Sequence, residues 1–301
     1  MKNKINLTRI RFGMSMISLV LVLAAVSVIA FKGFNWGLDF TGGVVTEFEV
    51  ENSVGSELLK STFDRALEQD VQLMNSGENR WIVRYSQPDG VLPQVNDLLA
   101  GVGGEVKVLN SSIVGPQVGQ DMVEKGGLAV LTCIVLTMIY LSWRFEWRLA
   151  LGALAALVYD ITLVLGLFSV MGLEFNLTVL AAVLAVLGYS LNDSIIIADR
   201  VRELFKAKPQ GDTGQLIDDA VVATFSRTVI TSGTTFVTVA CLWLLGGASL
   251  QGFAIALCFG IVSGTWSSIS VGVTLPQLIG LKPTHYIQVK EEFEEGEGYY
   301  P

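Results

Sequence analysis

Six apolar segments, each of about 20 residues, restrict this chain more than any other feature of its sequence. A helix needs about 20 apolar residues to cross a bilayer, because each residue adds only about 1.5 Å to its length. Of the 301 residues, 51% are hydrophobic and 16% are charged, whereas an average soluble domain is about 25% charged. We therefore expect a polytopic α-helical membrane protein with six transmembrane helices, at about 12–31, 126–143, 149–170, 177–198, 226–246 and 253–275.

The first segment follows a cluster of positive charges and is too long for a cleaved signal peptide. Lys2, Lys4, Arg9 and Arg11 come before it. The apolar core of a signal peptide has about 7–15 residues. Residues 1–31 are therefore interpreted as a cytoplasmic N-terminus and an uncleaved first transmembrane helix.

The loops on the two sides of the expected membrane differ in charge. Loops after the second and fourth segments are basic, whereas those after the third and fifth contain no Lys or Arg. Cytoplasmic loops carry the excess of basic residues, so both termini are expected in the cytoplasm. The five later helices form a predicted bundle at 126–275, with a cytoplasmic loop at 199–225. Residues 276–301 form a predicted cytoplasmic acidic tail, whose last eleven residues are EEFEEGEGYYP.

Residues 32–125, between the first and second helices, are expected to form a small α+β domain outside the cytoplasm. VVTEFEVE (44–51) alternates as a strand does, and SELLKSTFDRALEQ (56–69) has helical spacing of its apolar residues. Further strands are predicted at 71–76, 80–86 and 105–114, and a second helix at 92–102. The order β-α-β-β-α-β is that of a ferredoxin-like unit.

Two Gly-rich stretches flank this domain: GLDFTGG (37–43) and GPQVG (115–119). In the first, Gly37, Gly42 and Gly43 permit unusual backbone angles, and Asp39 can accept backbone N–H hydrogen bonds. Either a structural turn or a hinge between domain and membrane fits this composition.

Three ionisable residues fall inside the apolar segments: Asp160, Asp193 and Arg227. An Asp at the centre of a bilayer helix costs about 2.5–3.5 kcal/mol on insertion scales, so such residues are expected to have partners and functions. Asp160 shares a helix face with Ala153 and Ala156, which predicts that it points into the bundle.

On the fifth helix, several threonines fall on the same side as Arg227 at 100° per residue. They are Thr224, Thr231, Thr234, Thr235 and Thr238. Hydroxyls at this density favour a helix interface or a wet cavity over lipid. Arg227 is then a partner for Asp193, in a proton switch or in a static salt bridge. It also fits an interfacial anchor that snorkels to the headgroups.

The Asp193 stripe on the fourth helix includes Tyr189, Ser190 and Arg200, with Asn192 on the neighbouring stripe. Burial favours a protonated carboxyl group, and a nearby guanidinium favours the ionised one. Movement of Arg227 relative to Asp193 would therefore change the proton occupancy of Asp193. A charge that falls through 100 mV supplies about 2.3 kcal/mol, enough to bias a two-state bundle.

The three Cys residues lack CxxC spacing, and one His cannot form a metal cluster alone, so no metal site is predicted. Gly260 and Gly264 form a GxxxG pattern on the last helix, which is a packing signal.

Four motifs occur in one order: GLDFTGG, VGPQVG, LGYSLNDSIIIADR and SRTVITSGTTF. In these motifs, and in its six-helix plan, the chain resembles the SecF membrane subunits of the bacterial SecD–SecF protein-export complex, relatives of proton-driven RND transporters. The resemblance implies a multi-pass inner-membrane protein that uses the proton-motive force to aid late steps of preprotein export. It implies no enzymatic reaction and no cofactor, with protons as the coupling ion.

The resemblance also implies roles for individual residues. Asp193 and Arg227 match the family's intramembrane proton-relay positions, with Thr231 one turn on, and Asp160 is a further candidate. Supporting residues are Asn192, Tyr189, Ser190 and Thr235, and the hinge motif is Gly37, Asp39, Gly42 and Gly43. The implied partners are a SecD-like subunit, the SecYEG translocon, YajC, YidC and preprotein substrates. One departure is Tyr159, which stands where the family often has a His before the third-helix Asp.

Three other functions fit parts of the sequence. An RND-like proton-driven exporter of small molecules or lipids is the nearest, but a single outer domain of about 90 residues does not build a substrate funnel. An intramembrane aspartyl protease needs a Gly-x-Gly-Asp stretch, whereas Leu191 and Asn192 precede Asp193 here. A purely structural assembly subunit is the third alternative.

Overall fold

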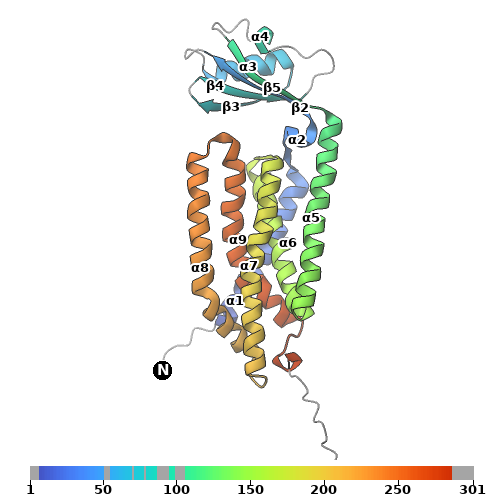
Figure 1. The fold of residues 1–301 in the computed structure, drawn as a ribbon, viewed down its shortest axis with the longest axis vertical. Coiled ribbons are helices and arrows are strands. Elements are labelled where there is room, and N and C mark those ends of the chain that lie inside the picture. Colours follow the sequence, from blue (N-terminus) through green and yellow to red (C-terminus); the bar gives the residue numbers. More distant parts are fainter. Residues whose placement is uncertain are drawn as a thin grey trace, which may run out of the picture.

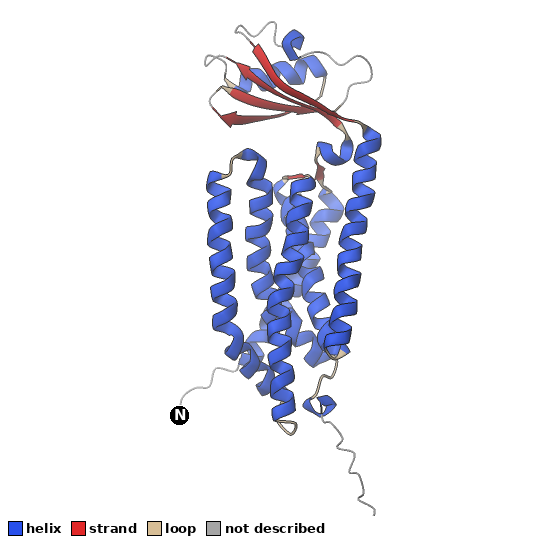
Figure 2. Ribbon diagram, viewed as in Figure 1, coloured by secondary structure: helices blue, strands red, loops and turns tan. Residues whose placement is uncertain are grey.

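The computed structural model describes residues 7–50, 55–69, 71–77, 79–86, 95–98 and 106–286. Six long helices form a bundle, and a sheet with short helices lies beyond one end of it (Figure 1; Figure 2). The long helices are α1 (Leu7–Lys32), α5 (Pro116–Arg144), α6 (Trp147–Met171), α7 (Leu177–Ala207), α8 (Thr213–Leu245) and α9 (Ala248–Leu278). Each contains a stretch long and apolar enough to cross a membrane, which confirms the prediction of six such helices.

Helices α6, α7 and α9 form the centre of the bundle. About half of their apolar windows is buried (44%, 44% and 56%), compared with 11%, 6% and 17% for α1, α5 and α8. The outer three helices therefore present most of their surface to lipid or to another protein.

Glycine residues, which have no side chain, let the central helices approach closely. A Cβ on Gly260 of α9 would lie 2.2 Å from Val186 Cγ2 of α7, and one on Gly152 of α6 would lie 2.3 Å from the Gly272 carbonyl oxygen of α9. The predicted GxxxG pair thus lies at a helix contact, because Gly264 faces Ser190 of α7.

The structure corrects the predicted loop at 199–225. α7 continues to Ala207 and α8 begins at Thr213, so only 208–212 connects them. The added turns are amphipathic and bury Phe205, Ile217 and Val221 in a common apolar cluster, which explains why the chain stays helical there. Asp212 caps α8 by accepting a hydrogen bond from the Gln215 backbone N–H.

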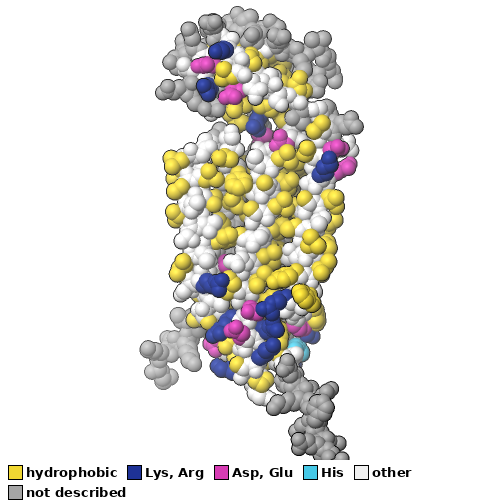
Figure 3. All heavy atoms as spheres, in the orientation of Figure 1, with side chains coloured by type: hydrophobic (Ala, Val, Ile, Leu, Met, Phe, Trp, Pro, Cys, Tyr) yellow, Lys and Arg dark blue, Asp and Glu magenta, His cyan; other side chains and the backbone are white. Residues whose placement is uncertain are grey.

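Charged side chains gather at the end of the bundle farthest from the sheet, which we call the sheet-distal end (Figure 3). Several of them form exposed ion pairs there, such as Arg144 with Asp199 and Arg200 with Glu203. After α9, a short 3-10 helix, η1 (Pro283–Tyr286), packs Tyr286 against Phe205. Most of the predicted tail, residues 287–301, lies outside the described residues.

The sheet contains four antiparallel strands in the order β3-β4-β2-β5. They are β2 (Gly43–Val50), β3 (Gln72–Gly77), β4 (Arg80–Tyr85) and β5 (Val106–Val114). Helices α3 (Ser56–Leu67) and α4 (Val95–Leu98) cover the face that points away from the bundle (Figure 1). Phe48, Leu59, Phe63 and Val83 are fully buried between sheet and helices. The other residues of the predicted helix at 92–102 lie outside the described part of the chain.

A compact connector joins the sheet to the bundle. Strand β1 (Asn35–Trp36) pairs in parallel with β6 (Glu174–Phe175), and the four-residue helix α2 (Leu38–Thr41) follows. The second predicted linker, 115–119, is not a loop, since Pro116 starts α5, where a proline is favoured. A Cβ on Gly119 would lie 2.5 Å from the Phe40 carbonyl oxygen, so this glycine lets α5 pack against the connector.

Candidate functional site

Asp160 lies at the centre of the bundle and is fully buried, as its alanine-rich face predicted. Its Oδ2 atom accepts hydrogen bonds from Ser190 Oγ of α7 at 2.5 Å and from Ser267 Oγ of α9 at 2.8 Å. Its Oδ1 atom has no hydrogen-bond partner among the described residues. Hydroxyl groups from two neighbouring helices, rather than a cation, therefore hold this carboxyl group.

Asp193 is the second buried carboxyl group, with 1% of its surface exposed. Ser232 Oγ of α8 lies 3.4 Å from its Oδ2 atom, and Thr265 Oγ1 of α9 donates to Ser232 Oγ at 2.8 Å. Within the described part of the chain, Asp193 Oδ1 has no partner. The fifth apolar helix does supply a partner for Asp193, but that partner is a serine hydroxyl.

Arg227 is exposed and forms no ion pair with Asp193 in the described structure. The static salt bridge left open by the sequence is therefore absent from this conformation.

Most of the threonine-rich face of α8 does not point into the bundle of this chain. Thr224, Thr228 and Ser232 point into the bundle, whereas Thr234 and Thr238 are exposed and Thr231 and Thr235 are half-buried. The hydroxyls of this outer face donate to carbonyl oxygens one turn earlier in α8, at 2.9–3.0 Å. Because each hydroxyl is satisfied within its own helix, a threonine-rich face can lie on the outside of a bundle.

The other predicted residues near Asp193 occupy different surroundings. Ser190 is buried and bonded to Asp160, so it belongs to the first carboxyl site. Tyr189 is half-buried, and its hydroxyl oxygen is inaccessible and without a partner among the described residues. Asn192 is exposed, on the outer side of α7.

Sequence reasoning missed the polar face of α9. The stretch SGTWSSISVGVT (263–274) places Ser267 on Asp160 and Thr265 on the Ser232 that faces Asp193. The density of Ser and Thr in this apolar helix was a readable signal. One polar helix thus reaches the surroundings of both carboxyl groups.

Sequence reasoning also missed a buried ion pair at the sheet-distal end. Arg11 is fully buried, and its Nε atom lies 2.6 Å from Asp218 Oδ1 of α8. Thr8 also binds Asp218, and Arg11 donates to Gln277 of α9. In the sequence, Arg11 is visible only as one of the positive charges before the first helix. In the structure, its side chain joins α1 to α8 and α9.

The predicted hinge motif contacts the start of α7. Asp39 Oδ2 accepts a hydrogen bond from the Leu177 backbone N–H at 2.9 Å, and the Gly37 N–H donates to the Phe175 carbonyl oxygen. Gly42 and Gly43 have φ angles of 74° and 150°, which side chains rarely adopt. The motif is therefore a well-bonded connector in this conformation.

Together, these contacts place two carboxyl groups in the bundle interior, each with one oxygen that has no hydrogen-bond partner among the described residues. A carboxyl group in such surroundings can bind or release a proton only if water or a moving helix reaches it. The helix beside Asp193 is α8, which also carries Arg227 and is mostly exposed.

Comparison with known proteins gives consistent results. Residues 94–281 match the family described as Protein export membrane protein SecD/SecF, C-terminal, and residues 27–54 match the SecD/SecF GG Motif. The Protein translocase subunit SecF of Vibrio alginolyticus is 39% identical, over 93% of this chain and 91% of its own length. That of Escherichia coli O157:H7 is 36% identical, over 92% and 88%.

The structure is also similar to that of SecDF from Thermus thermophilus, a translocon-associated membrane protein, with a TM-score of 0.79 and 32% sequence identity. The similarity covers 92% of this chain and 39% of that one. This chain thus spans about two fifths of the SecDF polypeptide, and the matches cover both the bundle and the connector. The chain belongs to the SecF family of protein translocase subunits.

Proposed function

We propose that this chain is a proton-motive-force-driven accessory subunit of the preprotein translocase, which aids late steps of export across the bacterial inner membrane. The names of its relatives support the export role. The observation that carries the proton coupling is Asp193, a buried carboxyl group in an apolar helix. Among the described residues it has one hydroxyl contact and no ion pair, and one of its oxygens has no partner.

In this proposal, α8 controls the charge state of Asp193. When Arg227 lies on the outer side of α8, as it does here, Asp193 is favoured in its protonated form. A rotation or shift of α8 that brings the guanidinium to Asp193 would favour release of the proton. Thr231, one turn on, and Asp160, on the other side of α9, are the next proton sites of this relay.

We also infer the orientation of the chain and the nature of its outer domain. The antiparallel order β3-β4-β2-β5, with two helices on one face, supports a ferredoxin-like domain in the periplasm. The concentration of basic side chains at the sheet-distal end supports cytoplasmic termini.

The partners follow from the relatives and from the exposed helices. This chain matches only 39% of the SecDF polypeptide, so the remainder of that polypeptide corresponds to a second unit. We therefore propose that a SecD-like subunit packs against the exposed faces of α5 and α8. The SecYEG translocon, YajC, YidC and preproteins are proposed as further partners, and protons as the only coupling ligand.

Replacement of Asp193 tests the relay directly. In inverted membrane vesicles with a proton gradient, Asp193→Asn should lower gradient-dependent preprotein export by about tenfold or more, because Asn cannot bind or release a proton. Asp199→Asn, which changes an exposed carboxylate on the same helix, should export normally. Normal export by Asp193→Asn would reject the proton relay, and the copurified subunits show whether the complex is intact.

A second replacement separates a relay role for Arg227 from an anchor role. Arg227→Lys keeps the charge but loses the planar guanidinium, so a relay predicts a loss of export well beyond that of a surface change. An anchor that snorkels to headgroups is served equally by Lys. Wild-type export by Arg227→Lys and also by Arg227→Leu would rule out the switch.

A further inference from the structure

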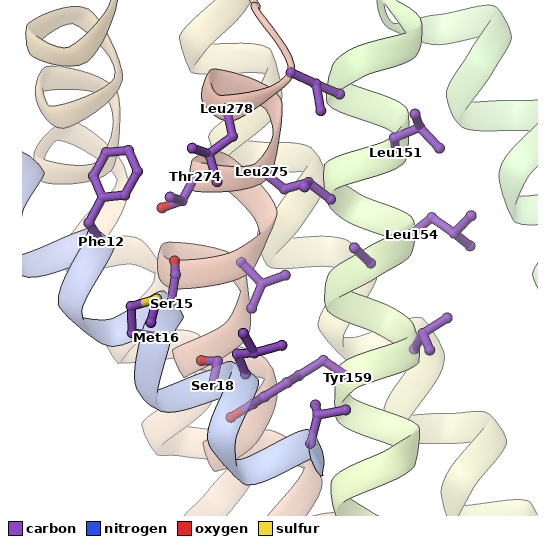
Figure 4. A pocket seen from close by; sticks show the side chains of 16 residues that line it. Phe12, Ser15, Met16, Ser18, Leu151, Leu154, Tyr159, Thr274, Leu275 and Leu278 are labelled. Atoms are coloured by element: carbon purple, nitrogen blue, oxygen red, sulfur yellow. The ribbon is translucent and has the colours of Figure 1, made fainter. Parts of the chain in front are cut away.

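Helices α1 and α6 touch near the sheet and separate toward the sheet-distal end. A Cβ on Gly166 of α6 would lie 2.6 Å from Ala25 Cβ of α1, so the two backbones almost meet there. At its other end, α1 is held to α8 and α9 through Arg11 instead. A groove therefore opens between α1 and α6, with α9 as its floor (Figure 4).

This groove has the size and lining of a ligand site. Its volume is about 730 Å³, within the range of about 300–1,000 Å³ that is usual for small-molecule pockets. The lining is apolar apart from Ser15, Ser18, Tyr159 and Thr274. Phe12 and Leu278 lie toward one end of the groove, and Ser18 and Tyr159 toward the other (Figure 4).

The open side of the groove is made of exposed apolar side chains. Met16 and Leu19 of α1 are 63% and 53% exposed, Val158 of α6 is 49% exposed, and Leu278 of α9 is 65% exposed. All four lie within helices long and apolar enough to cross the membrane, so the groove opens toward hydrocarbon. The ligand that the bilayer supplies to such a groove is a flexible acyl chain of a lipid.

Each helix that lines the groove has a basic residue near its sheet-distal end: Arg9 in α1, Arg148 in α6 and Lys282 after α9. Arg9 and Lys282 are exposed and form no ion pair among the described residues. Arg148 is paired with Glu146 and donates to the carbonyl oxygen of Ile279, which lines the groove.

The nearby acidic groups leave this rim positive. Glu146 is paired with Arg148, and Asp218 is paired with Arg11. Asp212, the cap of α8, keeps its negative charge and lines a hollow with Arg9, so these groups together carry one net positive charge. Arg9 and Lys282 are the basic residues of this rim without an ion pair among the described residues, and they are available to an anionic group at the end of the apolar groove.

Thr274 supplies one further polar contact. Its side chain is 1% exposed, and its Oγ1 atom has no partner among the described residues. It lies in the groove, on the same side as Phe12 and Leu278 (Figure 4). A buried hydroxyl of this kind usually has an acceptor, and the ester carbonyl of a lipid lies just below its headgroup.

We propose that this groove binds one acyl chain of an anionic phospholipid, with the phosphate group held by Arg9 and Lys282. The proposal rests on the proposed orientation, since the cytoplasmic leaflet carries the anionic lipids. The lipid would fill the space between α1 and α6 and so hold α1 against the rest of the bundle.

Native mass spectrometry of the complex purified from membranes tests the proposal. After exchange into mixed micelles, wild type should retain phosphatidylglycerol in preference to phosphatidylcholine. Arg9→Gln with Lys282→Gln should lower that preference by about tenfold, because each basic residue near the surface contributes to anionic lipid binding. The control pair Lys206→Gln with Lys208→Gln removes the same charge from the end of α7 and should keep the preference.

A bulky residue in the groove tests the acyl-chain site separately. Ala155→Phe, which adds a ring to the lining, should lower retention of both lipids by about tenfold, whereas Ala24→Phe, at an exposed position of α1 outside the groove, should not. A thermal unfolding curve of each variant shows whether it is folded. The double variant Arg9→Gln with Lys282→Gln tests the headgroup site independently of the acyl-chain site. Equal retention in all variants, or a partner helix cross-linked into the groove, would overturn the proposal. Asp193→Asn should retain lipid normally, so this result is separable from the export assay.

Discussion

At the residue scale, the two buried carboxyl groups differ in how firmly the protein holds them. Asp160 accepts two hydrogen bonds, at 2.5 and 2.8 Å, from helices of the tightly packed centre. Among the described residues, Asp193 accepts one side-chain hydrogen bond, at 3.4 Å, from the peripheral helix α8. Asp193 is therefore the group whose surroundings change most easily, and Asp160 is the more rigid site.

The hydrogen bond from Ser267 to Asp160 predicts a stability difference between two neighbouring serines. Ser267→Ala should lower the free energy of unfolding by about 1–3 kcal/mol, because it leaves a buried carboxyl oxygen with one partner fewer. Ser268→Ala is a matched control, since Ser268 is equally buried but bonds only to the Thr265 carbonyl oxygen of its own helix. Thermal unfolding in detergent gives the comparison, and equal midpoints for the two variants would contradict it.

At the element scale, the packing of α9 against α7 depends on a glycine. Gly260→Ala should destabilise the bundle by about 1–3 kcal/mol, because its Cβ would lie 2.2 Å from Val186 Cγ2 and overpacking strains the neighbours. Gly233→Ala in α8 has open space around its Cβ and should be neutral or stabilising by up to about 1 kcal/mol. Unfolding midpoints measured side by side check the sign of each change. A stable Gly260→Ala variant would show that α7 and α9 can separate freely.

The helices and their ends differ in how far the sequence predicts them. Apolar length fixes the number of membrane helices, and small residues beside Asp160 correctly predict that it points inward. The sequence does not predict which side of α8 faces the bundle, because threonine hydroxyls that bond to their own helix look the same in sequence as hydroxyls that need a partner. The ends of α7 and α8 were mispredicted because hydropathy falls at the membrane surface, whereas Phe205 and Ile217 continue the helical pattern beyond it.

At the scale of the whole molecule, one ion pair links the sheet to the bundle. Arg84 of β4 donates to both carboxylate oxygens of Glu174 at 2.9 and 3.1 Å, beside the β1–β6 pair. The Asp39 bond to the start of α7 lies in the same connector. Sequence could not predict this link, because Arg84 and Glu174 are 90 residues apart and neither lies in a motif.

Loss of that ion pair should loosen the sheet relative to the bundle. Arg84→Ala removes charged hydrogen bonds of about 1.5–3 kcal/mol in total, without touching the core of the sheet. Spin labels at Lys107 of β5 and Leu250 of α9 should then report a broader distance distribution. Arg80→Ala, at the exposed start of β4, should leave the distribution unchanged. An unchanged distribution in Arg84→Ala would mean that the Asp39 connector alone sets the position of the sheet.

The Asp39 bond to Leu177 also sets an order of events during synthesis. The two residues are 138 positions apart, so a ribosome that adds about 5–20 residues per second needs roughly 7–28 s between them. Every strand of the four-stranded sheet precedes residue 115 and is made within that interval. In the proposed orientation, the sheet can therefore fold outside the cytoplasm while α6 and α7 are still being made. The contact of the connector with α5 can form early, but β1 gains its partner β6 and Asp39 gains its Leu177 bond only when the chain reaches the start of α7. Until then Asp39 and the edge of β1 are open to chaperones or to neighbouring chains.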